Sequence, residues 1–67
     1  MKSEIINFGK RIREIRLKKK MSQGDIAKKL GVHRSYISGL ERGKRNPSLL
    51  TINKMAKAMG VEPKELL

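Results

Sequence analysis

The sequence contains no cysteine and no tryptophan, and its only histidine is His33. A disulfide, a cysteine metal site and a zinc site built on paired histidines are therefore excluded. Phe8 and Tyr36 are the only aromatic residues, and no stretch alternates apolar and polar residues long enough to predict a strand. No apolar run reaches the length of a membrane span, and the first ten residues lack the apolar core of a signal peptide. We therefore expect a soluble, cytoplasmic, all-α protein that needs no metal or other cofactor and no membrane.

Acidic residues are also scarce. Asp and Glu number 6 against 17 Lys and Arg, which gives a net charge of +11 in only 67 residues. Such an excess predicts a polyanionic partner, with nucleic acid the first candidate and an anionic membrane surface the second. A chain of this length forms one domain, here residues 1–67, whose core is too small to enclose a substrate pocket comfortably. We therefore expect a binding protein and no enzyme.

The apolar residues recur every three or four positions, which predicts helices. Five short helices are predicted, and their starts lie at Ser3, Ser22, His33, Ser48 and Glu62-Pro63. Serine is a favourable N-cap, proline suits the first helical position, and histidine is a poor cap. Glycines mark the predicted ends of the second, third and fourth helices.

The second and third predicted helices are separated by only three residues, Gly31, Val32 and His33. A turn of this length that contains glycine is typical of a helix-turn-helix. We therefore predict a helix-turn-helix over about residues 22–42.

A set of residues at fixed spacing extends over nearly the whole chain. It consists of Gly9, Ile12, Arg13, Arg16, Ser22, Gln23, Ile26, Ala27, Gly31, Val32, Tyr36, Ile37, Ser38, Leu40, Glu41, Arg42, Gly43, Arg45, Asn46, Pro47, Ser48, Met55, Ala56, Met59, Gly60 and Val61. With this set the sequence resembles the Cro/phage-repressor helix-turn-helix family, also called XRE-like. Three segments, residues 36–38, 41–43 and 45–48, are also similar to controller proteins of restriction–modification systems.

The resemblance implies a compact five-helix, lambda-repressor-like DNA-binding domain. It also implies a sequence-specific transcriptional regulator that binds double-stranded DNA as a homodimer on a near-palindromic operator. Ile6, Leu49, Leu50, Leu66 and Leu67 offer apolar surface on which a dimer could form. The sequence departs from the family at His33, where Ser or Thr is usual, and at Gly39, where a long polar base reader is common.

Candidate base contacts lie on the third predicted helix, whose N-terminal end meets base edges in helix-turn-helix docking. They are Arg34, Ser35, Tyr36, Ser38 and Gly39. The fork of Arg34 matches the two acceptors of guanine, whereas the serines discriminate weakly and could equally be plain surface residues. Tyr36 could contact DNA or pack at the rim of the core. Gly39 either admits a close approach of the helix backbone to DNA or is simply tolerated.

Candidate phosphate contacts flank that helix. They are Ser22, Gln23, Arg42, Lys44, Arg45 and Asn46. Gln23 lies in the first turn of a helix, where free N–H groups bind anions, and the resemblance assigns it a phosphate contact. The four later residues form a mostly basic turn directly after the proposed reading helix.

Arg16 and Glu41 lie beside the inner faces of the first and third predicted helices. A lone charge there would be costly, so we predict that they pair and lock the two helices together. The resemblance implies the same structural ion pair.

Two other functions fit the same composition. An antitoxin that regulates its own synthesis would share the fold, although the chain offers no additional segment for toxin binding. A non-specific basic protein that binds nucleic acid, RNA or a membrane surface would share the charge. Exposed aromatic residues for stacking on RNA bases are scarce, and the apolar stripe of the first helix is explained by the core.

Overall fold

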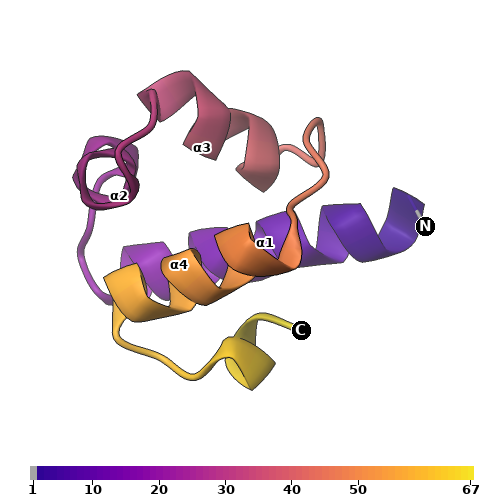
Figure 1. Cartoon of the computed structure of the whole chain (residues 1–67). Helices are drawn as coiled ribbons and strands as arrows, with labels where there is room; N and C mark the ends of the chain where they lie inside the picture. The colour runs from indigo at the N-terminus through magenta and orange to yellow at the C-terminus, as the bar shows by residue number, and fades with distance from the viewer. Residues whose placement is uncertain (1) are drawn as a thin grey trace.

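A computed structural model describes residues 2–67, which fold into helices joined by short turns (Figure 1). In chain order the elements are α1 (Lys2–Lys18), α2 (Gln23–Leu30), α3 (Arg34–Glu41), α4 (Leu49–Met59) and the 3-10 helix η1 (Pro63–Leu66). No strand is present in this part of the chain. None of the described helices is long and apolar enough to cross a membrane.

The prediction of five α-helices is wrong by one, because the last segment is a 3-10 helix. Its backbone bonds run from residue i+3 to residue i, as in Glu65 N–H to Glu62 O at 2.9 Å. A four-residue segment is too short to complete the i+4 bonds of an α-helix. The prediction of Ser3 as a cap is also wrong, since α1 already includes Lys2 and Ser3 lies inside it.

The ends of α2 and α4 follow from their capping residues. The Ser22 hydroxyl accepts from Asp25 N–H at 2.9 Å, and the Asp25 carboxylate accepts from Ser22 N–H at 2.8 Å, which completes a capping box. Ser48 caps α4 in the predicted way, by accepting from Thr51 N–H at 3.1 Å. Gly31 ends α2 in the left-handed conformation at φ 74°. His33 forms no side-chain cap bond, in keeping with its poor capping ability, and α3 ends at Glu41, one residue earlier than the predicted end just before Gly43.

The core gathers apolar side chains from every element. It consists of Phe8, Ile12, Ile26, Ala27, Ile37, Leu40, Ile52, Met55, Ala56, Met59 and Leu66. One prediction fails here: Leu66 is fully buried and offers no surface for a partner, whereas Leu49 is 78% exposed.

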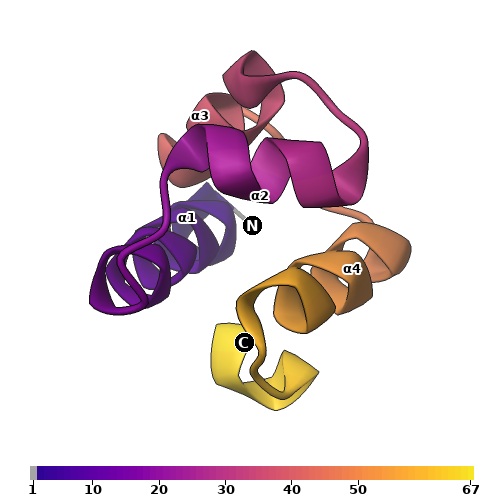
Figure 2. The ribbon, with the colours of Figure 1, turned by 90° about the vertical axis from the view of Figure 1, so that its left-hand side faces the viewer.

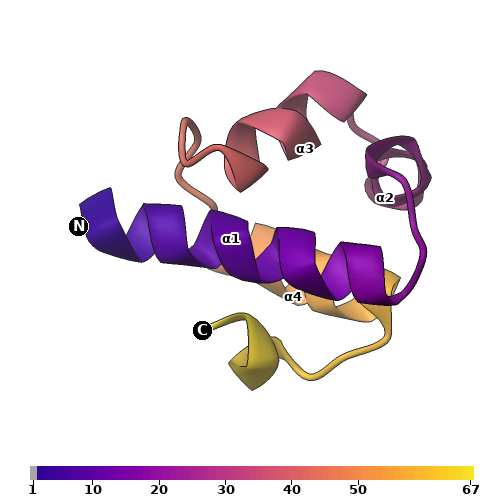
Figure 3. The same cartoon turned by 180° about the vertical axis from the view of Figure 1, so that it is seen from behind.

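Helices α1, α2 and α4 pack around the core, and α3 lies at the surface of the molecule. Seen from the side, α2 spans the distance between α1 and α4, with α3 above it (Figure 2). From behind, α1 crosses in front of α4, and η1 lies below both (Figure 3). The backbones of α1 and α3 approach closely at Gly9, where an added Cβ would lie 2.8 Å from Glu41 O and closer still to Leu40 O. This close contact fixes the distance between α1 and α3.

Candidate nucleic-acid interface

Helix α3 presents one polar side to solvent and one apolar side to the core. Ile37 and Leu40 are fully buried, whereas Arg34 and Ser35 are exposed at the N-terminal end. Ser38 is half-buried on the next turn. Because Ile37 and Leu40 face the core, the rotation of the helix about its axis is fixed, and the residues of its first turn face solvent.

Arg34 is held by α2. Its Nη1 donates to Gln23 Oε1 at 3.1 Å, which links the front of α3 to the first residue of α2. A guanidinium has five N–H donors, so this bond leaves others available to a ligand. Arg34 is therefore exposed but partly oriented before any ligand arrives.

Beneath Gln23 lies the predicted pair of Arg16 and Glu41. Arg16 Nε donates to Glu41 Oε2 at 2.6 Å and Nη2 donates to Oε1 at 3.0 Å, a two-point contact between α1 and α3. Arg16 Nη1 also donates to the Met21 carbonyl at 3.0 Å, and Gln23 Nε2 donates to Glu41 Oε1 at 3.1 Å. The side chains of Arg16 and Glu41 are only 10% and 4% exposed. The hydrogen bond to the Glu41 carboxylate raises the pKa of Arg16, which keeps its guanidinium charged.

Tyr36 lies at the rim of the core. The ring is half-buried against core residues, and its hydroxyl lies 3.5 Å from Thr51 Oγ1 on α4. The Arg45 guanidinium lies 5.9 Å from the centre of the ring, within cation–π range. Of the two interpretations of this residue, the packed position is the one the geometry displays, with part of the ring still exposed.

Gly39 is covered by a side chain from the following loop. It is buried, and an added Cβ would lie 2.9 Å from Cγ of Arg45. The loop after α3 folds back and places the Arg45 side chain over this turn. Gly39 as a base contact stays a prediction, and a duplex reaches its backbone only if the Arg45 side chain moves away.

The predicted phosphate contacts do not form one cluster. Arg42, Lys44, Arg45 and Asn46 are all exposed in the loop that follows α3. Asn46, however, borders a small apolar groove with Ile5 and Phe8 beside the beginning of α1, away from the front of α3.

At the start of α2 the local bonding is already specified. The Ser22 hydroxyl is occupied by its cap bond, and both amide ends of Gln23 are engaged. The hydrogen bond from Ser22 N–H, followed by the nearby Ser22 hydroxyl, lowers the pKa of Asp25, so that its carboxylate is charged at neutral pH. The first N–H groups of a helix have no partners within the helix, and they are the phosphate-binding groups available here.

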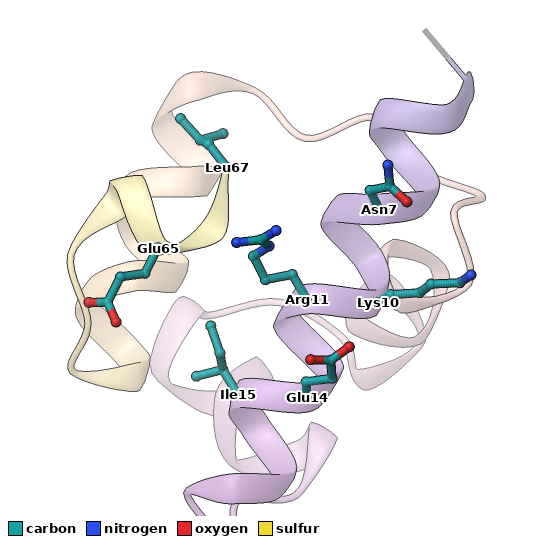
Figure 4. A pocket seen from close by; sticks show the side chains of 7 residues that line it. All are labelled: Asn7, Lys10, Arg11, Glu14, Ile15, Glu65 and Leu67. Carbon is teal, nitrogen blue, oxygen red and sulfur yellow. The ribbon is translucent and has the colours of Figure 1, made fainter.

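Another surface hollow lies between α1 and η1, and its side chains carry charges of both signs (Figure 4). It is lined by Asn7, Lys10, Arg11, Glu14, Ile15, Glu65 and Leu67. His33 lies elsewhere, at the start of α3, and cysteine is absent from the sequence. Among residues 2–67 no group of three or more metal-binding side chains comes together.

Two contacts at this interface were not predicted. Gln23 joins Arg34 to Glu41, which lie 11 and 18 residues from it in sequence. Thr51 places its hydroxyl near Tyr36 as well as 3.0 Å from the hydroxyl of Ser48. The i, i+3 spacing of Ser48 and Thr51 could have indicated their contact, but no local pattern indicates the bonds of Gln23.

Known proteins are similar to this chain in sequence and in fold. Residues 12–66 match the helix-turn-helix family. The control protein C.BamHI of Bacillus amyloliquefaciens is 54% identical over 61 residues, which cover 90% of this chain and 75% of that protein. The restriction-modification controller protein C.AhdI from Aeromonas hydrophila has a crystal structure similar to this fold, with a TM-score of 0.93, 46% identity and coverage of 97% of this chain and 98% of that one. The controller protein C.Esp1396I, solved as a tetramer in complex with its natural 35 base-pair operator, gives a TM-score of 0.82 at 32% identity and coverage of 94% and 93%.

Proposed function

This chain belongs to the helix-turn-helix family of DNA-binding transcription regulators, and we propose that it occupies an operator by placing the front of α3 in the major groove. The observation that carries this proposal is the position of Arg34, which is exposed at the first turn of α3 and fixed from behind by Gln23. In helix-turn-helix docking this turn meets base edges, and an arginine fork matches the O6 and N7 acceptors of guanine. Ser35, Ser38 and the exposed part of Tyr36 lie along the same helix and supply the remaining contacts.

The phosphate backbone is bound on both sides of α3. On one side lie the first N–H groups of α2, which we assign to a phosphate in place of the Gln23 side chain, since that amide is already bonded. On the other side lie Arg42, Lys44 and Arg45, exposed and cationic. Asn46 follows these residues in the same loop, beside α1. These contacts fix the register of α3 and supply affinity without base preference.

We propose that the regulator acts as a homodimer. Leu49, Leu50 and Leu67 are 78%, 63% and 74% exposed, more than a monomer of this size needs to leave in water. These residues and the half-exposed Ile6 lie on elements other than α2 and α3, so that pairing through them leaves both reading helices open. Two reading helices about 34 Å apart would then meet successive major grooves of a near-palindromic site. The related controller protein C.Esp1396I was solved as a tetramer in complex with its operator, so a similar chain self-associates on DNA.

Occupancy of DNA requires no bond to be made or broken. We therefore propose that the chain acts as a single binding domain, not as an enzyme, and without a cofactor, and that it acts in the cytoplasm, on operator DNA there.

Selection of bound duplexes from a random DNA pool tests the function directly. The pool is incubated with the protein at two salt concentrations, and recovered duplexes are sequenced. We expect two similar half-sites in inverted orientation, with a guanine at a fixed position in each. Recovery of unrelated sequences at both salt concentrations would reduce the protein to a non-specific basic DNA-binding protein.

A further inference from the structure

Below the proposed reading surface, four side chains form one continuous hydrogen-bonded chain. It runs from the buried Arg16 through Glu41 and Gln23 to the exposed Arg34, with donor–acceptor distances of 2.6, 3.1 and 3.1 Å at its three links. Helices α1, α2 and α3 each contribute to it. We propose that Glu41, which is too buried to touch a duplex, sets the base specificity of Arg34 by fixing the amide of Gln23; this inference rests on the proposed function.

The direction of the chain follows from the chemistry of its two ends. An arginine can only donate hydrogen bonds, and a carboxylate can only accept them. Arg16 takes two positions on the Glu41 carboxylate, and Glu41 Oε1 then accepts from Gln23 Nε2. The amide oxygen of Gln23 is thereby turned toward Arg34, where it accepts from Nη1. Any other orientation of the amide would set a donor against a donor.

Burial makes this arrangement rigid. The side chain of Glu41 is 4% exposed, and that of Arg16 is 10% exposed and also bonded to the Met21 carbonyl. Hydrogen bonds in such surroundings are stronger than in water, and the charges of Arg16 and Glu41 strengthen the bonds between them further. The oriented acceptor on Gln23 therefore holds Arg34 in one geometry at the front of α3. Preorganised side chains recognise a ligand better, since less motion is lost on binding.

The isosteric change Glu41→Gln weakens the buried end of the chain while the volume is kept. Glutamine has one accepting atom instead of two, and Arg16 presents two donors to it. Whichever way the new amide turns, its NH2 group faces a donor of Arg16, so that one of the two side chains has to shift. The single neutral oxygen also accepts from Gln23 Nε2 more weakly than the carboxylate does. Gln23 then holds Arg34 less firmly, although every residue that would touch DNA is unchanged.

The proposal is tested by base preference, measured on duplexes selected with the wild-type protein. Preference is the ratio of dissociation constants for the selected duplex and for one changed at the base pair where Arg34→Ala loses discrimination. One bidentate arginine–base pair contributes about 5- to 150-fold to this ratio. We expect Glu41→Gln and Gln23→Met each to lower the ratio several-fold, and the double variant to lower it no further than either change alone.

Gly60→Ala is the matched control. It strains the left-handed backbone at the end of α4 and lowers the melting temperature, yet it leaves all four side chains of the hydrogen-bonded chain in place, so the ratio is expected to stay near the wild-type value. All ratios are measured below the onset of melting of each variant, and Gln23→Met decides the outcome if Glu41→Gln does not fold.

Two results would overturn the inference alone. One is a wild-type ratio in Glu41→Gln or Gln23→Met, and the other is a loss in Gly60→Ala equal to the loss in Glu41→Gln, which would make the loss a general consequence of lower stability. A wild-type protein that prefers no duplex would remove the proposed function itself.

Discussion

Replacement of Arg16 by alanine perturbs the buried junction of α1, α2 and α3 most strongly. It deletes three hydrogen bonds at once, two to the Glu41 carboxylate and one to the Met21 carbonyl. Glu41 keeps only the bond from Gln23, and its side chain remains 4% exposed. The folded state of the variant therefore has to bury a carboxylate with one neutral partner.

The cost follows from that burial. Removal of one partner of a buried ion pair destabilises a protein by about 3–5 kcal/mol. A 67-residue domain has a total stability on the order of 3–10 kcal/mol, from about 0.05–0.15 kcal/mol per residue. Arg16→Ala is thus expected to remove a large share of the stability. Glu41 raises the pKa of Arg16, so the contribution of the Arg16 charge to the free energy of unfolding is complete below the ordinary pKa of arginine and is lost only at higher pH. Titration of Arg16 therefore does not change the cost of Arg16→Ala near neutral pH.

Urea denaturation at 25 °C measures the effect, with Arg13→Ala as the matched control. Arg13 has the same chemistry on the same helix but is exposed, so its loss should change the unfolding free energy by less than about 0.5 kcal/mol. Joint replacement of Arg16 by Met and Glu41 by Leu should recover most of the loss, since no charge is then stranded. If Arg16→Ala costs only a few tenths of a kcal/mol, as the control does, the pair is not buried in solution and the reasoning fails.

Three further predictions address the fold, its caps and the charge of the interface. Gly9→Ala should destabilise by about 1–3 kcal/mol in thermal melts because its Cβ meets backbone carbonyls of α3, whereas Gly24→Ala, with its nearest neighbour at 3.6 Å, should stabilise by about 0.4–1 kcal/mol. Asp25→Ala should lower the free energy of unfolding at pH 7. The difference from wild type should shrink as the pH falls through the lowered pKa of Asp25, because a carboxylate with a lowered pKa stabilises the fold only while it is charged. A constant difference down to pH 2 would contradict this. Lys44→Ala should weaken specific and scrambled duplexes alike and reduce the slope of log affinity against log salt by about one, which titrations at several salt concentrations check.

The sequence predicts most of the elements because their ends are coded locally. Ser22 and Asp25 form their capping box within four residues, and Gly31 and Gly60 end helices through their own left-handed conformations. The burial of Ile12, Ile26, Ile37 and Leu40 follows from helical spacing alone. Periodicity fails in η1, since four residues are too few to define a face and the core takes Leu66 but not Leu67.

The site is less predictable because its decisive contacts join distant segments. Pairing of Arg16 with Glu41 could be predicted, as both lie beside inner faces and carry opposite charge. The position of Arg45 over Gly39 could not, since it depends on the path of the loop after α3. The two bonds of Gln23 likewise require three helices to be placed together in space.

The most direct test of base reading by α3 compares Arg34→Ala with wild type in competition titrations on a selected duplex and a scrambled one. One arginine–guanine pair contributes about 1–3 kcal/mol of discrimination, so the variant should lose that much affinity for the selected duplex and its preference at one base pair. The scrambled duplex should be bound only slightly more weakly, by the loss of a single charge. Equal losses on both duplexes would contradict base reading by Arg34 and make it a phosphate contact.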